Sequence, residues 1–268
     1  MDVTSDVTDV RLEQLDRTDW AAVTGEEWTS AASVLDHLER NSHSVDSIRS
    51  LPWEHVLEGG ARVLDLGCGT GWVTGILTAR SDVGRVIAWD ASPTQLRDMV
   101  PQSVELVGGD IAKVETMCGL FTPLLLEDSS IDCAVLASAF HHAEEPHELL
   151  AELIRVVRPG GTIVLANEIP HPRLNMLRWI ATTSAAATVN SLSDRLHLAK
   201  PGHVAAGHIL YDDLLGDRSM TMPQWRRLFA QHPVSVEVVD SGMVPYQPTF
   251  RAPGRGQRNL THFILRPA

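Results

Sequence analysis

The stretch Val63-Leu-Asp-Leu-Gly-Cys-Gly-Thr-Gly71 decides the fold that this sequence predicts. An apolar run that begins at Ala61 ends in three glycines, and a helical pattern starts directly after them. Glycines at the end of a strand permit a tight turn and let a ligand approach the backbone, while the following helix offers N–H groups. The stretch therefore predicts a ligand-binding loop at the carboxyl end of a buried strand.

More apolar runs follow, rich in β-branched and aliphatic side chains and without strict alternation. They cover residues 85–90, 104–107, 131–137 and 162–167, with helical patterns between them, the clearest at 146–158. Such runs are typical of strands buried on both faces. With two further strands expected at 234–240 and 260–266, we predict an α/β fold: a doubly wound, mostly parallel, seven-stranded sheet with helices on both faces.

We expect a single domain with four parts. Residues 1–60 would form a helical cap, 61–168 the ligand-binding core, and 169–218 a helical insertion that covers the acceptor site. Residues 219–268 would add the last helix and an antiparallel strand pair. The insertion carries apolar residues at helical spacing, so it needs a packing partner, which is either the site or a second copy of the chain.

The composition excludes several classes of protein. The net charge is −12, with 22 basic against 34 acidic residues and no basic cluster, which disfavours nucleic acid and anionic membranes as partners. No apolar run approaches the roughly 20 residues of a membrane span, and the N-terminus is not a secretory signal. Three separated cysteines indicate neither a disulfide scaffold nor a zinc site. We therefore expect a cytoplasmic protein.

Three carboxylates stand where strands are expected to end. Asp65 lies two residues before the first glycine, where it would repel a pyrophosphate but favour a cationic ligand. Trp72 occupies a position that the dinucleotide fingerprint needs for close packing, so a dinucleotide oxidoreductase is disfavoured. Asp90 ends the second expected strand and can accept hydrogen bonds from ribose hydroxyls. Asp110 follows the third expected strand and can accept from an adenine amino group.

These residues resemble the class I S-adenosylmethionine-dependent methyltransferases, in particular their small-molecule branch. The resemblance covers residues 46–168 and includes the glycine loop, Val86-Ile-Ala-Trp-Asp90, Gly109-Asp110-Ile111, Phe140-His-His142 and the Arg158-Pro-Gly-Gly161 turn. It implies S-adenosylmethionine as cofactor and S-adenosylhomocysteine as product. Residues 1–45 and 170–218 have no counterpart throughout the family.

The resemblance also implies which residues bind the cofactor. Asp65 would orient the methionine ammonium, Asp90 would bind the ribose, and Asp110 the adenine amine. The Ile111 N–H would meet a ring nitrogen. The remaining implied contacts line the methionine arm or flank the ribose, and come from Gly67, Cys68, Gly69, Gly71, Ala91, Ala137 and Ser138.

Methyl transfer to a hydroxyl needs a base, whereas a carboxylate acceptor needs none. His141 and His142 follow the fourth expected strand and are candidate bases, although the same segment is also a plausible helix start. His208 and Tyr211, in the insertion, are second candidates for the base or for acceptor contact. The histidines and glutamates of residues 141–147 match no compact ligand signature, and Asp212-Asp213 is an ordinary polar turn, so we expect no metal.

The acceptor is expected to be a small organic molecule. After the fourth strand, Ala137-Ser-Ala-Phe140 lacks the Pro-Pro-aromatic motif of enzymes that methylate nucleobases or glutamine amides, and the adjacent Glu144 and Glu145 do not match protein-arginine enzymes. We predict O-methylation in secondary or small-molecule metabolism. Two alternatives stay open, namely a cyclisation or rearrangement without methyl transfer and a non-catalytic ligand-binding subunit. A homodimer through residues 169–218 is also consistent with the sequence.

Overall fold

The computed structural model describes residues 30–40, 43–170, 220–243 and 259–268. Its strands are β1 (Ala61–Leu66), β2 (Val83–Asp90), β3 (Val114–Cys118), β4 (Ile131–Ala137), β5 (Val157–Glu168), β6 (Val234–Asp240) and β7 (Thr261–Pro267). Its α-helices are α3 (Ala31–Arg40), α4 (Ser44–Arg49), α5 (Trp72–Thr78), α6 (Val100–Leu106), α7 (Pro146–Val156) and α9 (Met222–Phe229). Short helical turns are η1 (Trp53–His55), η2 (Gln95–Met99), η3 (Ile111–Lys113) and η4 (Phe140–His142).

The seven strands form one sheet in the order β3-β2-β1-β4-β5-β7-β6. The first five run parallel to one another, and β7 is antiparallel to both β5 and β6. The predicted doubly wound, mostly parallel, seven-stranded sheet is therefore confirmed. The order of the strands reverses between β1 and β4, and in open α/β sheets ligands bind outside the carboxyl ends of strands at such a point.

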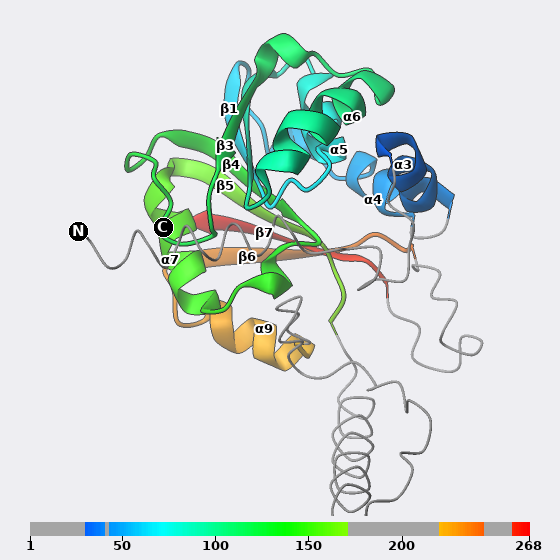
Figure 1. The fold of residues 1–268 in the computed structure, drawn as a ribbon. Helices are drawn as coiled ribbons and strands as arrows, with labels where there is room; N and C mark the ends of the chain where they lie inside the picture. Colours follow the sequence, from blue (N-terminus) through cyan, green and yellow to red (C-terminus); the bar gives the residue numbers. More distant parts are fainter. Residues whose placement is uncertain (1–29, 41–42, 171–219, 244–258) are drawn as a thin grey trace, which may run out of the picture.

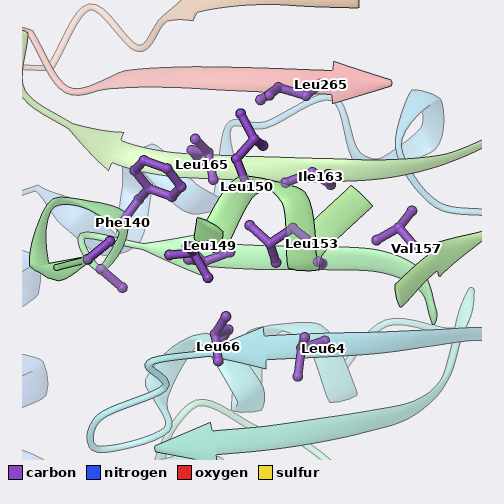
Figure 2. Packing of buried hydrophobic residues seen from close by; sticks show 14 of the residues in the cluster. Leu64, Leu66, Phe140, Leu149, Leu150, Leu153, Val157, Ile163, Leu165 and Leu265 are labelled. Atoms are coloured by element: carbon purple, nitrogen blue, oxygen red, sulfur yellow. The ribbon is translucent and has the colours of Figure 1, made fainter. Parts of the chain in front are cut away.

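Helices cover both faces of this sheet (Figure 1). One buried cluster joins β1, β4, β5 and β7 to α7 and α9, and a second joins the opposite face to α4 and α5. Figure 2 shows the first cluster, where Leu149, Leu150 and Leu153 of α7 meet side chains from the sheet. Burial of both faces explains why the strands are continuous apolar runs.

One element differs from its sequence-based prediction. Residues 104–107 were expected to form the third strand, but Val104 belongs to helix α6 and the third strand is β3, ten residues later. Val100 and Val104, one helical turn apart, are both buried against Cys68, Ala88 and Leu96. A four-residue apolar run fits a helix face as well as a strand, and here the helical packing prevails.

Helix α4 is joined to the sheet by a chain of buried polar contacts. The ring of His262, fully buried on β7, lies 3.1 Å from the Ser47 hydroxyl of α4 and accepts the Asn167 N–H at 3.3 Å. The Asn167 side-chain amide donates to the Ser44 carbonyl at 3.1 Å. These contacts hold α4 against the carboxyl end of β5.

Helix α9 begins with a capping box. Thr221 is the N-cap, and it forms a capping box with Gln224. In the part of the chain that the structure describes, no helix has the length and apolar character that crossing a membrane requires.

Candidate cofactor and active site

The glycine loop connects β1 to α5 at the carboxyl edge of the sheet. Gly67 and Gly69 both have positive φ, 71° and 51°, in the region that favours glycine. A Cβ at Gly69 would meet no atom within 4 Å, whereas a Cβ at Gly67 would lie 2.9 Å from the Ala139 Cβ. The backbone at Gly69 therefore faces open space that a ligand can enter. The Gly67 side of the loop packs closely on the turn after β4.

Asp65 lies on β1, just before this loop, and its side chain is 1% exposed. Its Oδ2 accepts a hydrogen bond from the Thr74 hydroxyl of α5 at 2.6 Å. Burial raises the pKa of Asp65 to about 7; the Thr74 hydrogen bond opposes the increase, and the charge of Asp90 adds to it. Among the residues that the structure describes, no basic side chain pairs with Asp65, and such a buried carboxyl suits a ligand that brings a positive charge.

Asp90 is the last residue of β2 and holds the glycine loop in place. Its Oδ2 accepts the Gly69 N–H at 2.8 Å, and its Oδ1 accepts the Ser92 N–H at 2.9 Å. Each carboxylate oxygen has two acceptor positions, so both oxygens retain capacity for ligand hydroxyls. Burial raises the pKa of Asp90, and the backbone hydrogen bonds and His142 partly offset that rise. The free acceptor positions of the two Asp90 oxygens fit the two hydroxyls of a ribose.

Asp110 and Ile111 do not lie where their predicted adenine contacts require. Asp110 precedes β3 and caps the turn η3. Its backbone N–H donates a hydrogen bond to the Thr78 hydroxyl, at the far end of α5. The length of β3, about 15 Å for five residues, separates Asp110 from the carboxyl edge at Cys118. The prediction was wrong because it rested on a third strand before Asp110 rather than after it.

The residues at the carboxyl end of β3 are different ones. Cys118 is paired in register with Asp90, and Gly119 donates its N–H to the Asp90 carbonyl at 3.0 Å. The Trp89 indole donates to the Leu120 carbonyl at 3.1 Å, and the Phe121 ring lies against Gly67. The sequence could have indicated this segment only if β3 had been placed correctly at residues 114–118.

Ala137 and Ser138 lie at the carboxyl end of β4, as predicted. Ser138 directly follows β4 and Asn167 is the last residue but one of the neighbouring strand β5, and both have positive φ, 51° and 56°. The Ser138 N–H donates to the Ala166 carbonyl at 2.8 Å. Non-glycine residues in this conformation are uncommon and are often found at functional sites.

His141 and His142 form the turn η4 directly after this segment. Their rings lie 4.3 Å apart, and His142 is close enough to Asp90 for its charge to lower the pKa of that carboxyl. The Nδ1 of His141 lies 3.0 Å from Oε2 of Glu168, the last residue of β5. The candidate bases and the glycine loop therefore share one edge of the sheet. Glu168 was not among the predicted site residues.

The structure describes only some of the other predicted site residues. Cys68, Gly71 and Ala91 belong to or flank the loops already described, and burial raises the pKa of the Cys68 thiol well above its usual range. His208 and Tyr211 lie outside the described residues, as do Asp212 and Asp213. Within the described ranges, no three histidine, cysteine or acidic side chains are grouped as metal ligands.

Comparison with known proteins identifies relatives of this chain. Residues 64–165 match the family model of a methyltransferase domain. A protein of a Streptomyces fradiae transposon is 42% identical over 40% of this chain and 30% of its own length. An uncharacterized methyltransferase of Mycobacterium tuberculosis is 27% identical over 64% of this chain and 74% of its own. A malonyl-acyl-carrier-protein O-methyltransferase of Laribacter hongkongensis is 29% identical over 61% and 54%.

Solved structures share the fold at low sequence identity. A geranyl diphosphate methyltransferase in complex with S-adenosylmethionine superposes with a TM-score of 0.58, covering 93% of this chain and 95% of that one at 16% identity. A 4+2 cyclase superposes with a TM-score of 0.56, covering 84% and 80% at 18% identity. The family match and the methyltransferase relatives, together with the strand order and the glycine loop, identify a methyltransferase domain at residues 64–165, whose cofactor is S-adenosylmethionine.

Proposed function

We propose that this chain transfers the methyl group of S-adenosylmethionine to a hydroxyl oxygen of a small organic molecule. One observation carries the proposal: the turn with the candidate bases packs directly on the cofactor loop. A Cβ at Gly67 would lie 2.9 Å from Ala139, which immediately precedes that turn. A proton acceptor beside a methyl donor is the arrangement that methylation of a hydroxyl needs.

The chain's own residues would hold the cofactor in a defined direction. Asp65 would receive its ammonium, and Gly69 would supply the open backbone surface beside it. Asp90 would accept from the ribose, and the segment from Cys118 to Phe121 would line the adenine. When bound, the cofactor supplies an electrophilic methyl group, so the protein's task is to align the acceptor, exclude water and take up a proton.

The nature of the acceptor is inferred from charge and from relatives. A net charge of −12 gives little attraction for nucleic acid or anionic lipid. By their names, one relative is a malonyl-acyl-carrier-protein O-methyltransferase and one similar structure is a geranyl diphosphate methyltransferase. These names support a small acceptor. We further propose a cytoplasmic location, and acceptor contacts from the insertion with His208 and Tyr211, or from that insertion in a second copy.

A product assay with isotope-labelled cofactor tests this function. The protein is incubated with methyl-¹³C S-adenosylmethionine and separate panels of phenols and alcohols, carboxylic acids, and amines. We expect S-adenosylhomocysteine to accumulate with a hydroxyl compound, and the label to appear in an O-methyl group. Asp90→Ala should abolish the signal, whereas Asp128→Asn, which removes an exposed carboxylate, should retain it.

Two results would contradict the proposal. Labelled product only from amines or acids would exclude O-methylation. Conversion of a compound to an isomer of equal mass without S-adenosylhomocysteine would indicate a reaction without methyl transfer. The 4+2 cyclase among the structures of this fold shows why the second result must be measured.

A further inference from the structure

We propose that Glu168 is a positioning residue that makes Nε2 of His141 a proton acceptor of the site. The inference rests on the proposed function and names the base for it. It starts from an unusual feature of β5, namely a carboxylate at its last residue that is 2% exposed. Burial of a carboxylate is costly unless its oxygens are hydrogen-bonded.

Both oxygens of Glu168 are used by the turn η4. Oε1 accepts the Phe140 N–H at 3.1 Å, and Oε2 lies 3.0 Å from Nδ1 of His141. An ionised carboxylate only accepts hydrogen bonds, so the pairing places the imidazole proton on Nδ1. In the neutral ring, the other nitrogen, Nε2, is then the acceptor.

The turn itself is fixed by the core, which makes the pairing more than a surface ion pair. Phe140 is fully buried, and its ring centroid lies 5.4 Å from that of Trp225 on α9. Figure 2 shows Phe140 pointing into the same cluster as Leu149 and Leu165. His141 follows directly in the chain and keeps a quarter of its side chain exposed. It is therefore firmly placed and partly exposed.

The two histidines have different neighbours. The charge of His142 acts on Asp90, which belongs to the cofactor side of the site. The carboxylate bound to His141 comes from β5, on the other side of β4. The titratable groups around the turn are Glu168, His142, Glu144 and Asp90. Glu168 orients the imidazole of His141, since its Oε2 lies 3.0 Å from Nδ1 of that ring.

This arrangement assigns a proton path and a substrate class. As the acceptor oxygen bonds to the methyl carbon, its proton moves to Nε2 of His141, and the electron pair of the broken carbon–sulfur bond stays on sulfur. The imidazolium that forms is stabilised by Glu168, 3.0 Å from Nδ1. Such a base is useful for an acceptor that carries a proton at neutral pH, so a phenol or enol fits and a carboxylate does not.

Nitrogen NMR of the histidine rings tests the inference without a substrate. Spectra of ¹⁵N-histidine-labelled protein are recorded from pH 5 to 9 for the wild type and Glu168→Gln. Glu148→Gln, on an exposed position of α7, is the charge-matched control. His141→Asn assigns the resonance. We expect Nδ1 of His141 to carry the proton in the wild type, with Nε2 as the unprotonated nitrogen.

In Glu168→Gln, we expect the proton affinity of His141 to fall at least about tenfold, which is a decrease of one in its pKa. The control should leave it unchanged. A proton on Nε2 in the neutral wild-type ring, or an equal titration in Glu168→Gln, would overturn the proposal. The wild-type result stands even if the variant fails to fold, and Glu168→Asp tests rescue by a shorter carboxylate. Lack of S-adenosylhomocysteine binding to the wild type would instead refute the proposed function.

Discussion

Replacing Asp65 by Asn should stabilise the ligand-free protein and weaken its binding of cofactor. Asn has nearly the same shape as Asp and can still accept from the Thr74 hydroxyl, 2.6 Å from Oδ2 in the wild type. It cannot ionise. The variant therefore isolates the cost of a buried charge that the cofactor's ammonium is expected to compensate.

The sign follows from the direction of the pKa shift. The pKa of Asp65 rises from 3.8 to about 7 on folding, so between these values the folded state binds a proton that the unfolded state has lost. The unfolding free energy of the wild type therefore falls as the pH rises through this window, and stays low above it. At 1.36 kcal/mol per pKa unit, the full penalty above pH 7 is about 4 kcal/mol, of which about 2.5 kcal/mol develops between pH 5 and 8.

Urea unfolding at several pH values measures this effect. The stability of Asp65→Asn minus that of the wild type should grow by about 2.5 kcal/mol between pH 5 and 8. Because both proteins share the other titrating groups, most of their contributions cancel. Asp128→Asn, at a carboxylate that is 76% exposed, should show no such trend. Calorimetry at pH 8 should show that Asp65→Asn binds S-adenosylhomocysteine at least about tenfold more weakly than the wild type, because a charged hydrogen bond is lost.

Two outcomes would refute the reasoning. A stability difference that does not change between pH 5 and 8 would mean that Asp65 is not held protonated by burial. Undiminished binding of S-adenosylhomocysteine by Asp65→Asn would mean that this carboxylate does not serve the ammonium.

Three more predictions concern the histidine under α4, the loop and metal. Burial lowers the pKa of His262 to about 4, so its contribution to the unfolding free energy should fall by about 3 kcal/mol as the pH drops from 6.5 toward 4, opposite in sign to the contribution of Asp65. The unfolding free energy of the wild type minus that of His262→Gln should therefore decrease toward low pH over pH 4.5–7, and a difference that does not change with pH would contradict it. Gly69→Ala should lower the unfolding free energy by about 1–2 kcal/mol, because its φ is positive, and should abolish cofactor binding. Gly67→Ala should unfold at a lower urea concentration than Gly69→Ala, because its Cβ would also meet Ala139 at 2.9 Å, and the reverse order of stabilities would refute this assignment. Methyl transfer should persist in EDTA, and activity that returns only with added Mg²⁺ or Fe²⁺ would show a metal requirement.

The parts of the fold that are local in sequence could be predicted from it. The glycine loop, the strand that precedes it and the helix that begins at Pro146 each have a pattern of neighbouring residues that suggests their structure. The run at Val104 is ambiguous at this level, because its burial comes from contacts with Cys68 and Ala88, far away in the chain. An error of one element was enough to misplace Asp110.

The pairing of the site residues was beyond sequence reasoning for a related reason. His141 and Glu168 are 27 residues apart, and their contact depends on β4 and β5 being neighbours with a specific register. The histidines could be recognised as candidates from their position after an expected strand. The carboxylate that contacts His141 comes from the end of the next strand, and this contact is visible only in three dimensions.

The measurement that tests the central claim most directly is calorimetric binding of S-adenosylhomocysteine to the wild type, Asp90→Ala and Asp128→Asn. Asp90 anchors the glycine loop through the Gly69 N–H and is expected to receive the ribose hydroxyls. We predict binding by the wild type and by Asp128→Asn, and loss of at least about tenfold in affinity for Asp90→Ala, whose circular dichroism should stay native. Equal affinity in all three proteins, or displacement of the ligand by NADH at the same site, would contradict a cofactor site at the ends of β1 and β2.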